Sequence, residues 1–255
     1  MNIRAVTTFN ESGLNKYGHR MLESYLKHWS AGVHLTVYKE GWNEVTALAP
    51  LDELITYKAL LPASPWLQDF KQRHAQLATD NYRFDAVRFS HKIAALLNAA
   101  VVHQADTQFL IWLDGDVITH SDFGAEHLDT LLPHDEAIAW LDRTRYYPEC
   151  GFYILNLQHE GTAELLMLLY QMYAKDRLFE LKEWHDSYVL QQCVIQLNVP
   201  VKSLSGPQGF PTHHPLINGP LGQWFDHLKG ARKAKGKSLR ADMFVTRDEA
   251  YWRGL

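Results

Sequence analysis

Two carboxylates, Asp114 and Asp116, stand one residue apart after the apolar run Phe109–Leu113, and apolar residues resume behind them. This pattern predicts a buried strand that ends in an acidic pair. Two buried negative charges are costly unless a cation compensates them, and oxygen ligands suit a hard divalent metal. An Asp-x-Asp is expected about once by chance in a chain of this composition, so an exposed turn after a strand is the alternative interpretation.

A second motif stands far downstream, where His227, Gly230 and Lys233 form an H-x-x-G-x-x-K pattern. Such a triplet is expected by chance in roughly 4 of 100 sequences of this composition and length, so it is more informative than the acidic pair. An imidazole can be a third metal ligand beside two carboxylates. Glycine lets the backbone approach a phosphate, and lysine neutralises phosphate charge.

Apolar residues recur along the chain with the periods of strands and helices in alternation. The chain opens with a predicted strand over Ile3–Phe9, a helix capped near Asn10 that runs to about Trp29, and a strand over His34–Lys39. This order favours a parallel sheet in an α/β fold. The further predicted elements are a helix over Asp85–His103, strands over Ala137–Leu141 and Gly151–Leu157, and helices over Gly161–Lys175 and Tyr188–Gln196. We expect irregular structure in Pro50–Asp80 and a loop over Pro207–Pro220, and the polar and aromatic segment Asp142–Cys150 joins the two strands on either side of it.

Ligands of parallel sheets bind at the carboxyl ends of the strands, which places Thr7, Thr8, Phe9 and Asn10 near a pocket. A purely capping role at this strand end is the alternative. Arg88 and Lys92 lie four residues apart on one helix face and can point at an anionic ligand, although a solvated helix face has the same pattern.

Asp186 lies at the polar and aromatic start of a predicted helix. It is placed either to contact a substrate or to serve only as the helix N-cap.

The composition bounds the class of protein. The chain has 255 residues, 46% of them hydrophobic, and a net charge of −4. We therefore expect one globular unit, with no global reason to bind nucleic acid or an anionic membrane. The basic run from Lys229 to Arg240 favours a local anion such as a diphosphate. Cys150 and Cys193 are expected to be free thiols, and the absence of an apolar leader or a spanning segment favours a cytoplasmic location.

In their order and spacing these motifs resemble the GT-A fold glycosyltransferases, specifically the glycogenin-like and bacterial galactosyltransferase-like group, family 8, which uses nucleotide sugars with retention. That group has a strand ending in D-x-D, then N-x-G-V-x-L-x-N, then an Asp at a helix start, then H-x-x-G-x-x-K-P-W. The matching segments here, within roughly residues 1 to 235, are Asp114–Asp116, Glu149–Asn156, Asp186–Ser187 and His227–Lys233. The resemblance implies a Rossmann-like GT-A fold, with a mixed central sheet flanked by helices. It also implies a single domain over 1–255, in which the basic segment 227–240 closes over the donor diphosphate.

The resemblance also implies roles for individual residues. Asp114, Asp116 and His227 would bind Mn²⁺ or Mg²⁺, which bridges the donor diphosphate. Lys233 and the Gly230 backbone would clamp that diphosphate. The other implied donor-binding residues are Thr8, Phe9, Asn10 and Tyr17 near the base and ribose, Arg88 and Lys92 near phosphate or sugar, and Asp114 with Gly115 at the acidic motif.

The chain departs from the family pattern at three places. Ala234-Lys235 replaces Pro-Trp, Glu149 replaces the first Asn, and Ser187 replaces an amide, so we expect a different sugar specificity.

The leading hypothesis is metal-dependent transfer of a hexose from a UDP-sugar, or less favourably a GDP-sugar, to the hydroxyl of a saccharide or other acceptor. A carboxylate near the anomeric carbon would stabilise an oxocarbenium-like transition state, with Asp186 as first choice and Glu149 as second. The possible sugar-stacking residues are Tyr146, Tyr147, Trp184 and Trp224. The sequence does not determine the acceptor or the oligomeric state.

Three other interpretations remain open at this point. A haloacid-dehalogenase-like phosphatase also has a D-x-D after a strand, but it needs Thr where Ile118 stands, and Ile118 also excludes an EF-hand loop. A catalytically inactive nucleotide-sugar-binding protein would keep the same metal ligands. A merely structural α/β domain would leave the ordered series of motifs unexplained.

Overall fold

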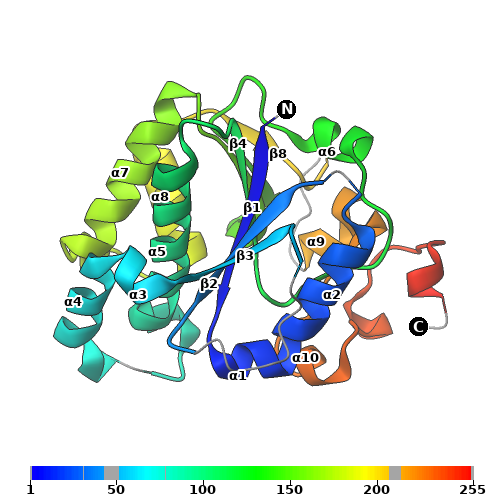
Figure 1. Ribbon diagram of the computed structural model, residues 1–255, viewed down its shortest axis with the longest axis horizontal. Helices are drawn as coiled ribbons and strands as arrows, with labels where there is room; N and C mark the ends of the chain where they lie inside the picture. The colour runs from blue at the N-terminus through cyan, green and yellow to red at the C-terminus, as the bar shows by residue number, and fades with distance from the viewer. Residues whose placement is uncertain (1, 31, 43–51, 78, 207–213, 254–255) are drawn as a thin grey trace.

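The computed structural model describes residues 2–30, 32–42, 52–77, 79–206 and 214–253. Its main sheet is mixed and has seven strands. Figure 1 shows this sheet at the centre of the molecule. Its strand order is β3 (Ile55–Ala59), β2 (His34–Lys39), β1 (Ile3–Phe9), β4 (Phe109–Leu113), β7 (Tyr146–Asn156), β6 (Ile138–Arg143) and β8 (Val201–Ser203). The strands from β3 to β4 pair in parallel, β7 is antiparallel to both β4 and β6, and β8 is parallel to β6. The predicted α/β fold with a mixed sheet is confirmed.

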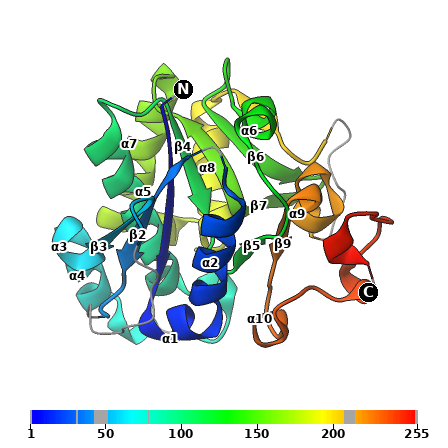
Figure 2. The same cartoon turned by 45° about the vertical axis from the view of Figure 1, so that its right-hand side comes forward.

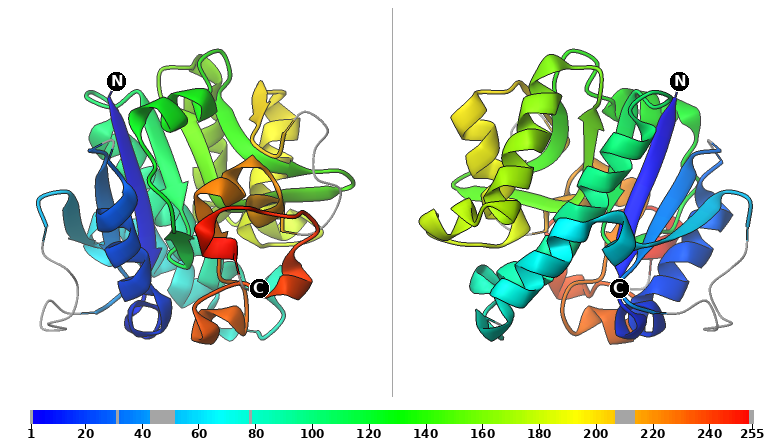
Figure 3. Two further views of the ribbon diagram at one scale, coloured as in Figure 1. Left: turned by 90° about the vertical axis from the view of Figure 1, so that its right-hand side faces the viewer. Right: turned by 60° about the vertical axis from the view of Figure 1, so that its left-hand side comes forward.

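Helices cover both faces of the sheet, which is why its central strands are apolar on both sides. Along β1, for example, Ala5 packs into the core on one face and Val6 into the core on the other. The two layers can be compared in the two views of Figure 3. One layer contains α3 (Leu60–Ala63), α4 (Pro65–Arg73), α5 (Ala86–His103), α7 (Glu160–Ala174) and α8 (Asp186–Leu197). The other contains α2 (His19–His28), α6 (Ala125–Leu131), α9 (Pro215–Asn218) and the C-terminal segment up to Trp252.

The predicted helix after β1 is present, in three parts. Asn10 caps α1 (Glu11–Gly13) by accepting a hydrogen bond from the Gly13 amide at 2.7 Å. A π-helical turn over Leu14–Gly18 then leads into α2. The predicted helix over Asp85–His103 is α5, and Asp85 is its N-cap. Both helices were predicted correctly because the capping residues and the apolar periodicity indicate the same segments.

Parts of three stretches that were expected to lie between helices and strands are regular in the structure, and the predictions were wrong for those parts. The described part of Pro50–Asp80 contains β3, α3 and α4, because Pro65 occupies the first turn of α4, where proline is tolerated. The segment Asp142–Cys150 forms the tip of a hairpin, in which β6 extends to Arg143 and β7 begins at Tyr146. Shifts of register between these strands interrupt the alternation of apolar and polar residues that would indicate a strand. Residues 207–213 lie outside the described residues, and the rest of the predicted loop contains α9.

A small second sheet joins the segment that follows Asp114 and Asp116 to the segment that ends at His227. In it β5 (Val117–Thr119) runs antiparallel to β9 (Phe225–His227), and Val117 pairs with His227. The Leu228 amide also donates to the Asp116 carbonyl at 3.0 Å. Figure 2 shows β9 beside β5, with α10 (Arg232–Lys235) below it near α1. Two segments more than a hundred residues apart in the chain are thus fixed side by side.

None of the helices in the described part of the chain is long and apolar enough to cross a bilayer. Cys150 and Cys193 are buried free thiols, as the sequence predicts.

Candidate active site

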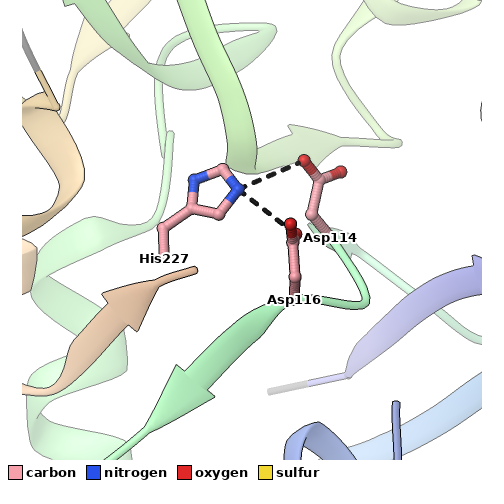
Figure 4. A group of neighbouring side chains, drawn as sticks. All are labelled: Asp114, Asp116 and His227. Carbon is pink, nitrogen blue, oxygen red and sulfur yellow. Dashed lines mark ion pairs between the residues drawn. The ribbon is translucent and has the colours of Figure 1, made fainter. Parts of the chain in front are cut away.

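Asp114, Asp116 and His227 converge at the carboxyl end of the central strand β4, as shown in Figure 4. The His227 Nε2 atom lies 3.2 Å from Asp116 Oδ1 and 3.7 Å from Asp114 Oδ2. One ligand atom from each residue falls within 4.8 Å of the other two. The predicted metal-ligand set is therefore brought together by the fold, as a possible metal site.

The local backbone explains why these carboxylates face the imidazole. The Asp114 amide donates to the Gly151 carbonyl at 2.9 Å, and the Val117 amide donates to the Asp114 carbonyl at 3.0 Å, which closes a tight turn between β4 and β5. A Cβ atom at Gly115 would lie 2.7 Å from the Phe9 ring, and one at Gly151 would lie 2.5 Å from the His227 ring. Both positions therefore require glycine for close packing.

The arrangement fits a divalent metal ion by the chemistry of its donor atoms. Two carboxylates and one imidazole suit a metal that accepts oxygen and nitrogen ligands. The 3.2 Å between His227 Nε2 and Asp116 Oδ1 is close to the ~3 Å that separates neighbouring ligands around an ion with bonds of about 2.1 Å. His227 is also oriented from behind, because its Nδ1 lies 2.7 Å from Glu149 Oε1. A carboxylate behind a ligating histidine fixes the ring and directs the other nitrogen to the metal.

Glu149 lies behind His227 and is only 3% exposed. Its Oε1 atom also forms an ion pair with Lys229 Nζ at 3.0 Å. Its Oε2 atom is buried and has no hydrogen-bond partner among the described residues. The carboxylate thus acts on the site through His227 and Lys229.

Lys92 links the acidic motif to Asp186. Its Nζ atom lies 2.8 Å from Asp114 Oδ1 and 2.7 Å from Asp186 Oδ2, and it is 4.9 Å from the centre of the Trp112 ring. Lys92 is 8% exposed, so the alternative of a solvated helix face is wrong for this residue. Asp186 is the first residue of α8, and His185 is the N-cap, so the purely capping alternative for Asp186 is wrong too.

Lys233 reaches the site from α10. Its Nζ atom lies 2.8 Å from Asp116 Oδ2 and 4.6 Å from the centre of the Tyr17 ring. Gly230, which precedes α10, has a φ of 57°, a left-handed conformation that favours glycine. The basic segment that contains Lys233 therefore folds back onto Asp116 of the acidic pair.

We call the four carboxylates and their four basic partners the charged centre; its members are Asp114, Asp116, Glu149, Asp186, Lys92, His227, Lys229 and Lys233. Burial acts to lower the pKa of His227, but the Asp116 and Glu149 carboxylates together outweigh it and raise that pKa to about 9. Burial acts to raise the pKa of Asp186, but the Lys92 ammonium holds it below its ordinary value. Opposite charges therefore keep buried carboxylates of this centre ionised.

One cavity of about 780 Å³ contains the charged centre. Every residue predicted for catalysis, donor binding or metal binding lines it, namely Thr8, Phe9, Asn10, Tyr17, Arg88, Lys92, Asp114, Gly115, Asp116, Glu149, Asp186, His227, Gly230 and Lys233. Thr7 does not line it, because its side chain is fully buried on the other side of β1 from Thr8. Of the four possible sugar-stacking residues only Tyr147 lines the cavity; Tyr146, Trp184 and Trp224 do not.

Several lining residues were missed by sequence reasoning. They are Glu40, Tyr82, Phe89, Arg143 and His185. Glu40 accepts a hydrogen bond from the Thr8 hydroxyl at 2.9 Å. Tyr82 lies in a short 3-10 turn and Phe89 in α5. Arg143 is the last residue of β6, and His185 is the N-cap of α8. No motif connects these segments, because only the folded chain brings them together.

A second cavity, of about 460 Å³, lies between α4, α5 and α7. Its lining contains no carboxylate, histidine or basic side chain, so it lacks the groups that metal, acid–base or phosphate chemistry would use.

With this geometry in hand, the chain can be compared with known proteins. It is similar to mouse xyloside xylosyltransferase 1 in its apo form, with a TM-score of 0.55, over 80% of this chain and 85% of that chain, at 13% identity. The chain has a GT-A glycosyltransferase fold. The apo WbbM bifunctional glycosyltransferase is a weaker match, with a TM-score of 0.48 and 11% identity over 80% of this chain and 39% of that one. No protein-family model and no curated protein sequence matches the chain.

Proposed function

We propose that the chain is a metal-dependent glycosyltransferase that moves a hexose from a nucleotide-diphospho-sugar to an acceptor hydroxyl. The observation that carries the proposal is the meeting of Asp114, Asp116 and His227 at a strand end of a GT-A fold. A UDP-sugar is the favoured donor, and retention of configuration follows from the family resemblance. Residues 1–255 would form one catalytic domain, with the segment 227–240 closing over the donor diphosphate.

The donor diphosphate would lie against the metal and the neighbouring cations. Asp114, Asp116 and His227 would hold Mn²⁺ or Mg²⁺, which when bound supplies positive charge to the leaving diphosphate. Lys233 and the Gly230 backbone would contact the phosphates. Arg88 is a suitable further phosphate contact, because no carboxylate pairs with it among the described residues. A cluster of fixed positive charge stabilises a leaving group as its negative charge develops.

The nucleoside would lie on the same side as Tyr17. Phe9 and Tyr17 both pack around Gly115, which places two aromatic rings beside the acidic motif. Asn10 and Thr8 lie at the end of β1, and their side chains line the same cavity. Aromatic rings next to hydrogen-bonding groups suit a base and a ribose.

Asp186 is the carboxylate that we propose to stabilise the oxocarbenium-like transition state. It is held ionised by Lys92, and Lys92 also contacts the metal-ligand set through Asp114. Glu149, the second choice, instead contacts His227 and Lys229. We therefore propose that Glu149 positions the metal-binding histidine and does not contact the sugar.

The alternative of a haloacid-dehalogenase-like phosphatase has no support from the site. The position that needs a hydroxyl is Ile118, which is 5% exposed and pairs with Asp226 in the small sheet. An inactive nucleotide-sugar-binding protein would use the same metal ligands, so only turnover separates it from a transferase.

Calorimetric titration with UDP and with GDP, each with and without Mn²⁺, tests the proposal. The expected result is binding of one nucleotide only when Mn²⁺ is present, weakened by about a hundredfold or more in Asp116→Ala and His227→Ala. Asp122→Ala is the matched control, since its side chain is 85% exposed and lies outside the cavity. Failure of both nucleotides to bind would refute the donor site. Binding without release of nucleotide from any UDP- or GDP-sugar would identify an inactive binder.

A further inference from the structure

The cavity extends past the charged centre to a group of aromatic side chains. We call Tyr82, Arg143, Tyr147 and His185 the aromatic end, and all four line the cavity. His185 directly precedes Asp186 in the chain. A series of contacts therefore connects one part of the cavity to the other, from Tyr17 through Lys233, Asp116, His227, Asp114 and Lys92 to Asp186 and the aromatic end.

The rings of the aromatic end are held together by direct contacts. The Tyr82 and Tyr147 hydroxyls are hydrogen-bonded at 2.8 Å. The His185 ring lies 4.3 Å from the Tyr147 ring and 5.5 Å from the Tyr82 ring, centre to centre. Tyr82 is nevertheless 46% exposed. A large aromatic side chain that is fixed and still half exposed presents an apolar face to a ligand.

The backbone fixes this group next to Asp186. Tyr82 lies in a 3-10 turn, Tyr82–Phe84, that Asn81 caps. The Arg83 carbonyl accepts a hydrogen bond from the Trp184 amide at 2.7 Å, which ties the turn to the segment before α8. The Arg83 side chain forms an ion pair with Glu183 at 3.7 Å. These contacts thus join the turn that contains Tyr82 to the segment that leads into Asp186.

Polar groups surround the rings. The Arg143 guanidinium lies 5.0 Å from the centre of the Tyr147 ring and donates through Nε to the Tyr147 carbonyl at 2.8 Å. Its Nη2 atom also donates to the Pro148 carbonyl at 3.4 Å, and no carboxylate pairs with Arg143 among the described residues, so the Nη1 donors are left for a ligand. Of the two paired hydroxyls, the one that accepts can still donate a hydrogen bond, and the one that donates can still accept one.

We infer that the aromatic end binds the acceptor and that the acceptor is a saccharide. One face of a pyranose ring is apolar and packs on Tyr82 and Tyr147, while its hydroxyls face Arg143 and the phenol groups. A lipid chain would need a continuous apolar surface, which the phenols and the guanidinium interrupt. The diphosphate of the donor fits the lysines of the charged centre, whereas the aromatic end contains no lysine.

The inference deepens the proposed function and rests on it for the reaction, but the binding can be measured without turnover. The probes are methyl glycosides of glucose, galactose and xylose, with methyl lactoside and methyl maltoside. Saturation-transfer NMR on the protein loaded with UDP and Mg²⁺, which is diamagnetic, detects which probes bind. We expect at least one probe to bind, with its Kd raised about tenfold in Tyr82→Ala and in Tyr147→Ala.

Two further variants control for folding and for the hydrogen bond between the phenols. Tyr146→Ala removes a neighbouring tyrosine that is 51% exposed and lies outside the cavity, and it should bind the probe as the wild type does. Tyr82→Phe keeps the ring and should change the Kd by less than about threefold. In both alanine variants the UDP affinity should stay within about twofold, since the two rings contact each other, His185 and Arg143 and not the metal-binding residues or the lysines of the charged centre.

Three results would overturn the inference. Absence of binding by every glycoside at about 20 mM, above the millimolar Kd of weak complexes, would exclude a saccharide as the ligand class. Unchanged binding in both alanine variants would place the saccharide elsewhere. Loss of UDP affinity in parallel with glycoside affinity would make Tyr82 and Tyr147 part of the donor site. If UDP fails to bind the wild type, the proposed function fails, and glycoside titration of the unloaded protein then decides whether the aromatic end binds a saccharide.

Discussion

The charged centre and the aromatic end share one cavity, but different forces hold them together. In the charged centre buried groups of opposite charge lie about 3 Å apart, as Lys92 does from Asp114 and Asp186. At the aromatic end the Tyr82 and Tyr147 hydroxyls are hydrogen-bonded to each other, His185 Nε2 lies 3.0 Å from Glu183 Oε2, and Tyr82 is half exposed. A change of one group in the charged centre leaves a buried charge unpaired, whereas a change of Tyr82 or Tyr147 at the aromatic end removes ring contacts and a hydrogen bond between uncharged groups. We therefore expect large, coupled effects at the first region and small, independent effects at the second.

The largest effect is expected for Asp186→Asn, which keeps the shape of the side chain and removes its negative charge. Turnover should fall by about a hundredfold to a thousandfold, because the oxocarbenium-like transition state loses its nearest carboxylate. The Kd for UDP with Mn²⁺ should change by less than about threefold, since the three metal ligands are untouched. Steady-state kinetics and calorimetry check the two parts. Full activity in this variant would remove Asp186 from the mechanism.

Lys92→Met tests whether the charged centre is held together by compensation of charge. The methionine has a similar length but leaves Asp114 and Asp186 without their shared cation. Breaking a buried pair in this way costs about 3 kcal/mol of the free energy of unfolding. Urea unfolding measures it, with Lys27→Met on the exposed face of α2 as the control, expected within about 0.5 kcal/mol of wild type. Tyr82→Ala should destabilise the protein less than Lys92→Met, and the opposite order would contradict the comparison.

The same contrast explains which parts of the site the sequence could predict. Asp114, Asp116, His227 and Lys233 stand in patterns with fixed spacing, and all four meet in the structure. The helix with Lys92 was predicted from its periodicity, but periodicity does not distinguish a buried lysine from a solvated one. The difference comes from tertiary contacts with Asp114 and Asp186, which no local pattern contains.

The aromatic end shows the other limit. Tyr82 lies in the stretch just after Pro50–Asp80, in a turn with no apolar period, and Arg143 lies where bulges interrupt the hairpin. Glu149 could be recognised as a departure from the family pattern, yet its contact with His227 depends on β7 and β9 meeting. A functional residue can be predicted from the sequence where one helix, strand or turn contains its whole motif. Tyr82, Arg143 and Glu149 make their contacts with residues of other elements, so no single motif predicts them.

Glu149→Gln tests whether this carboxylate positions the metal-binding histidine. The glutamine keeps a hydrogen bond to His227 Nδ1 but removes the charge behind the ring, and such a change weakens metal binding by about tenfold. Calorimetry with Mn²⁺ and UDP measures the affinity, with the exposed Glu160→Gln at the start of α7 as the control. Unchanged metal affinity together with a hundredfold loss of turnover would instead make Glu149 the catalytic carboxylate.

The smallest effect is a difference in salt dependence between the two regions. Binding of UDP with Mg²⁺ depends on charge, and raising NaCl from about 50 to about 500 mM shortens the screening length from roughly 14 to roughly 4 Å. The Kd for UDP should therefore rise by about fivefold, with most of the loss coming from the partly exposed Lys233 and Arg88. The Kd for the methyl glycoside should change by less than about 1.5-fold, because hydrogen bonds and ring packing involve no net charge on the ligand. Equal salt slopes for the two ligands would mean that both bind at the charged centre, which would remove the distinction between the two regions of the cavity.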